Sequence, residues 1–594
     1  MAIPKPAIRI GNVSGATGDA PSAMSRMASS GQVDVITGDW LSEMNIAWNA
    51  IAKSQDPSLG YEAGFLMQLE DSLEDIVKNG IKVVTNAGAL NTLELTRRVQ
   101  ELCRTKGHEL CVAAVLGDDI TPELHDPSFD PTAFKHLDHP EWTLADFSLK
   151  PYCGVAYIGC WGIVEALRNG ADIVICGRVT DASPVIGAAA WWHGWARDEY
   201  DRLARALVAG HLIECGPYIA GANFSGFKSL LPLVDLSFPI AEITHDGAVT
   251  ITRCRGGDGA VTITRCQGYG GELYLNSDVV ARLGEVRITQ AGPDRVEVSG
   301  ITGLPPPATT KAMIAAQAGY EAQAVFYLNG LDIQAKVQMM KQQLEHVFRN
   351  HRFSKLSIQV YGSVPEEPRS QAEGTVSLRV FAQAREKADI AADKFKIPIY
   401  ALRMQSYPGY HMNLDFRTMD PKPFMEIFPI VYPLDRIRHR VEMRGEVYEV
   451  PAHTDTAEYA RPRSYETAHP IPLSTFGATT RLPLGTIVHA RSGDKADNSN
   501  IGFFVRHADE YPWLQSYLTI QRLQQLFGDD YNPSCRIERC EFPGIYAVHF
   551  RVLDFLDGGI ASSSRIDGLG KGIGEYLRSR HADLPVRFVE RGAI

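Results

Sequence analysis

Five short runs rich in β-branched residues, all within the first 180 positions, each lead into a loop of Gly, Asp, Asn or Ser. Such runs predict strands, and strands repeated in this way form a parallel sheet whose carboxyl ends share one edge. Ligands bind in the crevice at that edge, so the five loops are expected to form one site, as in an enzyme or a small-molecule binder. The strands are predicted at 8–10, 33–37, 82–85, 111–116 and 172–176, and the loops follow at 11–19, 38–43, 86–91, 117–119 and 177–183.

The remaining pattern divides the chain into regions. Strands and amphipathic helices, one of them predicted over 61–79, alternate over 1–230, which predicts an α/β fold with a doubly wound, mainly parallel sheet. Strands outnumber helices over 231–450, so an α+β region of the same core is expected there. Residues 451–480 are rich in Pro, Thr, Ser and His and predict a linker. A new strand and helix pattern over 481–594 predicts a small C-terminal α+β domain.

Composition excludes several classes of protein. The 594 residues carry a net charge of −11 and no run of Lys or Arg, so neither nucleic acid nor an anionic membrane surface is an expected partner. No apolar run approaches the roughly 20 residues of a membrane helix, and the first residues lack a signal-peptide pattern. The 10 cysteines form no CxxC pair, which disfavours structural zinc. We expect a cytoplasmic protein that assembles as a homo-oligomer.

The first loop, GNVSGATGD, can present backbone N–H groups to an anion. Gly15 and Gly18 would allow the close approach, and Asp19 precedes a predicted helix. The spacing matches neither the dinucleotide fingerprint nor the P-loop. A site for a carboxylate or a CoA phosphate and a purely structural turn both remain open.

Acidic residues in three other loops are candidates for catalysis. Asp39 and Glu43 stand four residues apart at the start of a predicted helix, hence on one face, and can share a proton or hold a divalent cation. Asp119 and Asp181 are further candidates for acid–base or metal chemistry. Helix capping or ion pairing explains each acid equally well. The cofactor stays open, with Mg or Mn as the candidate cation.

Polar residues of the same loops can orient a substrate. Asn86 and Asn91 each offer hydrogen-bond donors and acceptors, and a capped turn between strand and helix explains them equally well. Arg178 can clamp a carboxylate or a phosphate, or pair with an acid of its own loop. His211 and Glu214 stand three apart in a predicted helix and form a second candidate acid–base pair, although such pairs are often structural.

The densest polar cluster, HARSGDKADNSNIGFF, lies in the C-terminal region and predicts a polar loop over 491–500 between two strands. Arg491, Ser492, Asp494 and Lys495 are expected to bind substrate or to dock onto the main domain. A solvated loop is the alternative.

A local duplication interrupts the middle region. DGAVTITRC occurs at 246–254 and again at 258–266, and each copy alternates Val or Ile with Thr. The pair predicts a surface β-hairpin with a Gly-rich turn.

Taken together, these motifs resemble the acyclic terpene utilisation (AtuA-like) family over nearly the whole chain. GNVSGATGD, DWLSE, NAGALN, GADIVICGRVTDAS, GHLIECG and HARSGDKADNSNIGFF resemble its recurrent segments, in the same order. The resemblance implies an AtuA domain followed by a ferredoxin-like domain. It also implies the breakdown of geranyl- and citronellyl-type acids alongside an acyl-CoA carboxylase. One departure is the duplicated segment, which stands where relatives carry a Gly-Thr-Gly-Gly loop.

Three hypotheses follow. The first is an enzyme of branched or acyclic-terpenoid acid metabolism, of hydratase or lyase type, acting on a carboxylic acid or its CoA thioester. The second is a metal-dependent hydrolase of a lactone or thioester in secondary metabolism. The third is a non-catalytic partner subunit of an acyl-CoA carboxylase.

Overall fold

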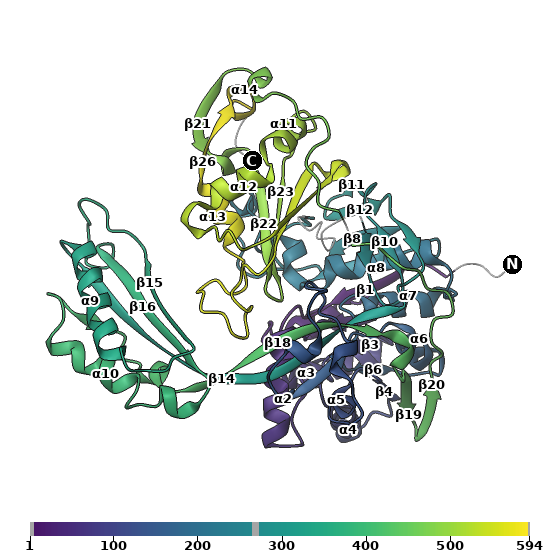
Figure 1. Cartoon of the computed structure of the whole chain (residues 1–594). Helices are drawn as coiled ribbons and strands as arrows, with labels where there is room; N and C mark the ends of the chain where they lie inside the picture. The colour runs from purple at the N-terminus through teal and green to yellow at the C-terminus, as the bar shows by residue number, and fades with distance from the viewer. Residues whose placement is uncertain (1–4, 264–272, 462, 592–594) are drawn as a thin grey trace.

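The computed structural model describes residues 5–263, 273–461 and 463–591. It is a mixed α/β fold with several sheets, divided into a core, a projecting arm (320–420) and a C-terminal domain (Figure 1). No helix in the described ranges is long and apolar enough to cross a membrane.

The core is built on an 11-stranded sheet in the order β11-β12-β8-β7-β1-β2-β3-β6-β4-β19-β20. All five strands predicted from the first 180 residues are adjacent and parallel at its centre. Antiparallel strands from the middle region extend both edges, so a mainly parallel arrangement describes only the centre. The central strands are β1 (Ile8–Asn12), β2 (Val35–Gly38), β3 (Lys82–Thr85), β6 (Ile173–Cys176) and β4 (Val112–Leu116). The edge strands are β7 (Pro239–Ile243), β8 (Val249–Arg253), β12 (Arg295–Ser299), β11 (Arg287–Gly292), β19 (Arg440–Met443) and β20 (Glu446–Glu449).

Helices pack on both faces of the central strands. Successive strand residues point to opposite faces, so Val35 packs with one helix group while Ile36 packs with the other. This is why the central strands are apolar on both sides. One group is α1 (Ala23–Ser29), α3 (Ala63–Asn79) and α4 (Thr92–Thr105), and the other is α6 (Trp161–Arg168), α7 (Ser183–His193) and α8 (Tyr200–Ile213).

Helix α3 shows how local sequence sets an element. Phe65, Leu69 and Leu73 recur at helical spacing and are fully or almost fully buried, while Glu70 and Asp71 between them face solvent. The helix ends at Gly80, whose φ of 65° is the left-handed conformation that glycine adopts most readily at a helix end. The prediction of a helix over this stretch is confirmed.

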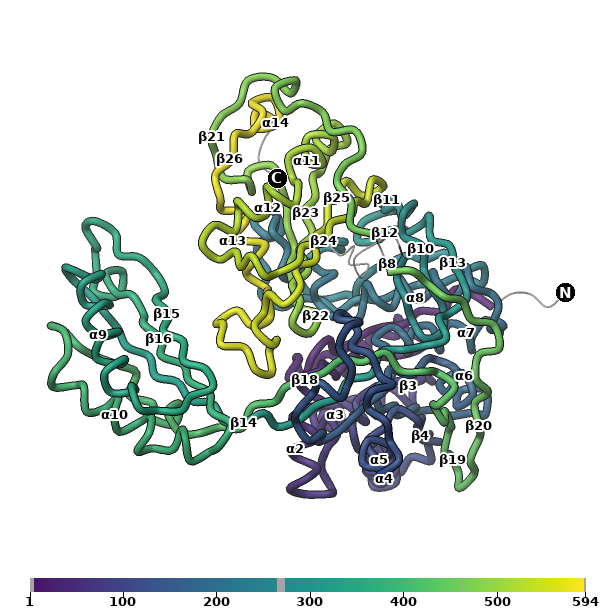
Figure 2. Tube along the Cα trace, in the orientation of Figure 1, coloured from purple at the N-terminus to yellow at the C-terminus, as the bar shows by residue number. Residues whose placement is uncertain are grey.

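The arm is carried by β14 (Thr309–Asn329), a strand of 21 residues. At about 3.3 Å per residue it is roughly 70 Å long, so its first half lies in the core and its second half in the arm (Figure 1, Figure 2). A bulge at Gly319 separates the halves, and a Cβ there would collide with the carbonyl oxygen of Ala384. The first half pairs with β18 (Lys422–Pro433) and β5 (Cys153–Ala156), and the second half with β16 (Thr375–Ala384) and β17 (His411–Met412).

Strand β15 (Lys355–Tyr361) completes the arm's sheet, and the helices α9 (Ile333–Phe348) and α10 (Lys396–Ala401) contribute to its apolar core. The core also contains α2 (Glu43–Gln55), α5 (Thr121–Leu124) and a small sheet of β9 (Leu273–Leu275), β10 (Val280–Arg282) and β13 (Thr302–Leu304).

The C-terminal domain is an antiparallel sheet in the order β22-β23-β25-β24 with its own apolar core. The polar loop predicted over 491–500 is wrong: this stretch is a β-hairpin of β22 and β23 that turns at Ala496 and Asp497. Most of its polar side chains are buried, because they pack within the domain and against the core, so polarity here does not mark solvent exposure. The strands are β22 (His489–Lys495), β23 (Asn498–Phe504), β25 (Ala547–Val552), β24 (Ile537–Phe542), β21 (Thr479–Pro483) and β26 (His581–Pro585). The helices are α11 (Tyr511–Tyr517), α12 (Ile520–Phe527), α13 (Ile573–Ser579) and α14 (Val586–Val589).

The duplicated segment does not form the predicted hairpin in the described residues. The first copy contains β8, whose two edges pair with β7 and β12 and leave no edge for the second copy. Residues 258–263 of that copy form no strand, and 264–266 lie outside the described residues.

Candidate functional site

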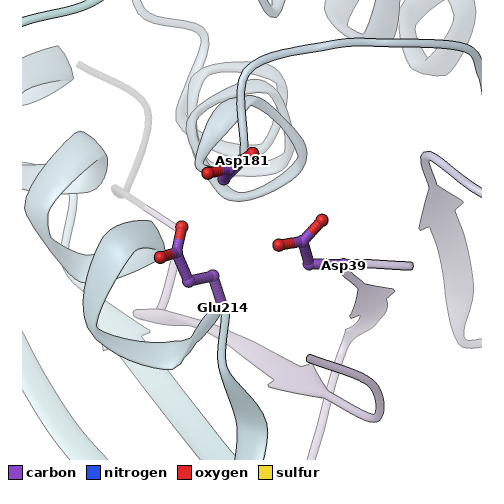
Figure 3. Close-up of side chains that lie close together, drawn as sticks. All are labelled: Asp39, Asp181 and Glu214. Carbon is purple, nitrogen blue, oxygen red and sulfur yellow. The ribbon is translucent and has the colours of Figure 1, made fainter. Parts of the chain in front are cut away.

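Three carboxylates from separate elements converge on one point. Asp39 follows β2, Asp181 precedes α7 and Glu214 caps the end of α8. One oxygen from each lies within 4.8 Å of the others, and Figure 3 shows the three groups facing a common space. Glu214 is buried and the two aspartates are partly buried. The structure therefore brings together three of the six acids and bases predicted as catalytic.

The loop after β3 orients Asp39. The buried Asn86 donates through Nδ2 to Oδ1 of Asp39 at 2.6 Å, and its own Oδ1 accepts from the N–H of Trp40 at 2.8 Å. Asn91 lies apart from the three carboxylates and holds the carbonyls of Pro57 and Leu59. Of the two amides predicted to orient a substrate, only Asn86 contacts a carboxylate of the group.

Arg178 is the cation beside the group, and its side chain is almost fully buried. It donates to Oδ1 of Asp181 at 2.6 Å and to the carbonyl of Leu41 at 3.2 Å. Its guanidinium lies 4.0 Å from the ring centre of Tyr157. The alternative that Arg178 pairs with an acid of its own loop is therefore observed.

Of the two aspartates after β4, Asp118 is buried and Asp119 is exposed. Oδ2 of Asp118 accepts from the backbone N–H of Arg178 at 2.6 Å, and burial raises the pKa of Asp118 to about 6. Asp119, the predicted candidate, is exposed and accepts from the N–H of Thr121. Adjacent residues of an extended chain point apart, so only one of the two can point into the interior, and it is Asp118.

Glu43 lies in a cationic pocket of its own. Its Oε1 accepts from Nζ of Lys311 at 2.7 Å and from the hydroxyl of Tyr157 at 3.0 Å. Burial acts to raise the pKa of Glu43, but Lys311 and Arg178 outweigh it and hold that pKa well below the usual range. Glu43 is therefore ionised, whereas it was predicted to act together with Asp39.

Asp39 has the opposite electrostatic environment. Burial raises the pKa of Asp39 well above the usual range, and the charges of Asp181 and Glu214 raise it further. Arg178 and the Asn86 hydrogen bond act against this rise without cancelling it. Asp39 therefore keeps its proton to a higher pH than an ordinary aspartate.

His211 reaches the group through Glu214. Its Nδ1 lies 3.4 Å from Oε1 of Glu214, and both are on the same face at the end of α8, as their spacing predicted. Nδ1 also lies 3.3 Å from the hydroxyl oxygen of Tyr274. A histidine, a carboxylate and a phenol are thus in contact beside Asp39 and Asp181.

The glycine loop at 11–19 packs on the same helix end. A Cβ on Gly15 would lie 2.5 Å from the backbone carbon of Cys215, so only glycine fits there. Oδ2 of Asp19 accepts from the N–H groups of Gly15 and Ala16 at 2.6 and 3.1 Å. The N–H groups predicted to hold a substrate anion therefore hold the chain's own carboxylate, while Gly18 turns with a φ of 88°.

The C-terminal domain brings charges to the edge of the site. Lys495, at the tip of the β22–β23 hairpin, lowers the pKa of Glu43, and burial together with the Glu43 charge raises the pKa of Asp494. The guanidinium of Arg491 lies 4.1 Å from the ring centre of Tyr218, shortly after the Glu214 helix end.

Ser492 has a structural role instead. It accepts from the N–H of Gly574 and donates to the carbonyl of Lys571, both within its own domain.

Sequence reasoning missed Lys311 and Tyr157, because they lie on β14 and just after β5 with no polar motif around them.

The comparisons with known proteins agree with this architecture. The chain belongs to the acyclic terpene utilisation family. Residues 8–443 match the description "Acyclic terpene utilisation family protein AtuA", and residues 482–583 match the AtuA ferredoxin-like domain. The resemblance and domain order predicted from the motifs are confirmed, and the membership supports a role in terpene-related metabolism.

Other comparisons add little. No curated protein matches the chain. A crystal structure of a homoserine dehydrogenase from S. aureus is 10% identical and covers 68% of this chain and 83% of its own. Its TM-score of 0.11 is too low to indicate a shared fold.

Proposed function

We propose that this protein is an enzyme of hydratase or lyase type that acts on a branched carboxylic acid or its CoA thioester. The observation that carries the proposal is the convergence of Asp39, Asp181 and Glu214, with the pKa of Asp39 raised. General acid–base catalysis needs a group whose pKa lies near the working pH, and ordinary aspartates titrate too low. Asp39 would therefore move the proton in the reaction.

The surrounding residues suit the handling of an anionic substrate. The pKa of Glu43 is lowered by three cations, Arg178, Lys311 and Lys495. The site therefore has a cationic side around Glu43 and an acidic side formed by Asp39, Asp181 and Glu214. A carboxylate or a polarised thioester carbonyl would be attracted to the first, while Asp39 exchanges a proton on the second. His211 with Glu214 would supply a further proton acceptor. Family membership supports the terpenoid class of acid.

Hydration of an unsaturated thioester provides the direct test. Addition of water places a hydroxyl on one alkene carbon and a proton on the other, and yields a product heavier by one water. We would incubate the protein with 3-methylcrotonyl-CoA, geranyl-CoA and the free acids, and analyse the products by mass spectrometry. The wild type should form product, Asp39→Asn should not, and Asp119→Asn, an exposed control, should match the wild type. Equal turnover by Asp39→Asn would contradict the proposal.

A second candidate is a metal-dependent hydrolase, favoured by the donor set itself. Three carboxylate oxygens within 4.8 Å suit a hard divalent cation such as Mg or Mn. A bound cation would polarise a carbonyl or activate a water, while Arg178 beside Asp181 opposes cation binding by charge repulsion.

Thermal unfolding separates the two candidates. A cation at 100 times its dissociation constant adds about 2.7 kcal/mol to stability. A rise in unfolding temperature with Mg or Mn, reversed by EDTA and lost in Asp181→Asn, would favour the hydrolase. Turnover of the thioester that is unaffected by EDTA would favour acid–base catalysis without a metal.

A further inference from the structure

Strand β15 is the outer strand of the arm's sheet. It pairs with β16 over its whole length, from Lys355 opposite Gln383 to Tyr361 opposite Ser377. In the part of the chain that the structure describes, no strand pairs with its other edge. None of its 7 residues is buried, whereas most residues of β16 are. The backbone groups of that edge are therefore open to a further strand.

The strand lacks the features that usually protect an edge. Natural edge strands carry charges, prolines or bulges that prevent pairing with another chain. The sequence of β15, KLSIQVY, has a single charge at its first residue, and its pairing with β16 is regular. Lys355 forms an ion pair with Asp557 of the C-terminal domain, so its charge is already balanced. Nothing in the strand opposes pairing with a copy of itself.

The order of side chains in β15 is self-complementary. In an antiparallel pair centred on Ile358, Leu356 lies opposite the partner's Val360, and Ile358 lies opposite itself. These three residues share one face, because side chains alternate along a strand. Leu356 and Val360 are 39% and 40% exposed at the rim of the arm core. A second copy would cover both.

We propose that β15 pairs antiparallel with β15 of a second copy of this chain, about a two-fold axis through Ile358. The two arm sheets then form one continuous sheet with their helix layers on the same face. The same patch serves both copies, as closed two-fold interfaces require.

The C-terminal domain contacts the other face of the arm's sheet, where Lys355 pairs with Asp557. Arg379 and Gln383 of β16 donate to the carbonyls of Ser564 and Ser562 at 2.5 and 2.8 Å. These side chains lie on the face opposite to Leu356, Ile358 and Val360, because they belong to the other set of alternating positions. The arm projects away from the core, with β15 on the side of the arm that faces the C-terminal domain (Figure 2).

The contact area places the dimer among small interfaces. Seven residues span about 23 Å, so the strand pair buries less than the roughly 1,200 Å² of a standard interface. Interfaces at this end of the range belong to weak or transient complexes. We expect a dimer that dissociates on dilution, with a dissociation constant on the order of 10 μM.

Charge substitutions at two facing positions test both the interface and its register. Leu356→Lys with Val360→Lys places like charges opposite each other in the dimer, and should weaken association at least tenfold. Leu356→Lys with Val360→Glu places opposite charges there, and should associate as the wild type does. Both variants alter only partly exposed side chains, so circular dichroism should show an unchanged fold. Sedimentation equilibrium of the full chain over ~1–200 μM, spanning the expected dissociation constant, measures the constants.

Cross-linking provides a second measurement. Ile358→Cys places one thiol on the axis, where opposite Cβ atoms in a strand pair are about 5 Å apart, close enough for a disulfide after a small adjustment. Mild oxidation should give a covalent dimer, while Val447→Cys, an exposed position on the edge strand β20, should not. A wild type that is monomeric throughout, or a dimer that both lysine substitutions leave unchanged, would overturn the proposal.

Discussion

Replacing Asp39 with Asn should stabilise the protein while abolishing the proposed hydration activity. Asp39, Asp181 and Glu214 are held within 4.8 Å of one another. At that distance and an effective dielectric constant of about 20, each pair of negative charges costs about 3 kcal/mol. The asparagine side chain removes two such repulsions and keeps an oxygen that accepts from Asn86. The lost attraction to Arg178 offsets part of the gain, so the net effect should be on the order of 3 kcal/mol.

The gain in folding stability of Asp39→Asn should depend on pH. The pKa of Asp39 is raised in the folded state, so the folded protein binds this proton more tightly than the unfolded chain. The stability that the proton contributes is fully present below the unfolded pKa of about 3.9, and is lost as pH rises through the raised folded pKa. The advantage of Asp39→Asn should therefore be small near pH 4 and complete above the folded pKa.

Urea unfolding in EDTA, from about pH 4.5 to pH 9, measures this difference. Asp119→Asn is the matched control, because that side chain is exposed and an Asn oxygen can still accept from Thr121. Its stability should follow the wild type at every pH. The reasoning would be refuted if Asp39→Asn were less stable than the wild type above pH 8, or if its advantage did not change with pH.

The other predictions concern neighbouring charges. Lys311→Met removes the ion-pair partner of Glu43 and should cost about 3 kcal/mol in urea unfolding, and a second change, Glu43→Gln, should recover most of it. Asp118→Asn should gain about 3 kcal/mol of folding stability, since the pKa of Asp118 in the folded protein is about 6. The gain should develop between about pH 4 and pH 6, and an unchanged stability at pH 8 would count against it. Lys495→Ala should lower kcat/KM for the thioester at least tenfold but change stability by less than about 1 kcal/mol. Equal kinetics in that variant would exclude a role for the hairpin tip.

Much of the core could be predicted because its signals are local. Apolar runs followed by Gly, Asp or Asn predicted the five central strands, and helical spacing predicted α3. The C-terminal hairpin was missed because its polar residues are buried in contacts with other elements, which a local polarity pattern does not report. The same limit applied to the duplicated segment, whose first copy finds its partners in β7 and β12.

The sequence by itself determined which side chains are candidates for the chemistry: loop acids, a loop arginine and a His–Glu pair at helical spacing. The tertiary structure decided which of them meet. Asp39 lies close to Asp181 and Glu214 because parallel strands and helix ends place their loops at one sheet edge. Glu43 instead pairs with Lys311, 268 residues away in the chain. Burial and mutual repulsion then separate the pKa values of Asp39 and Glu43, since both effects depend on distances in space rather than on spacing along the chain.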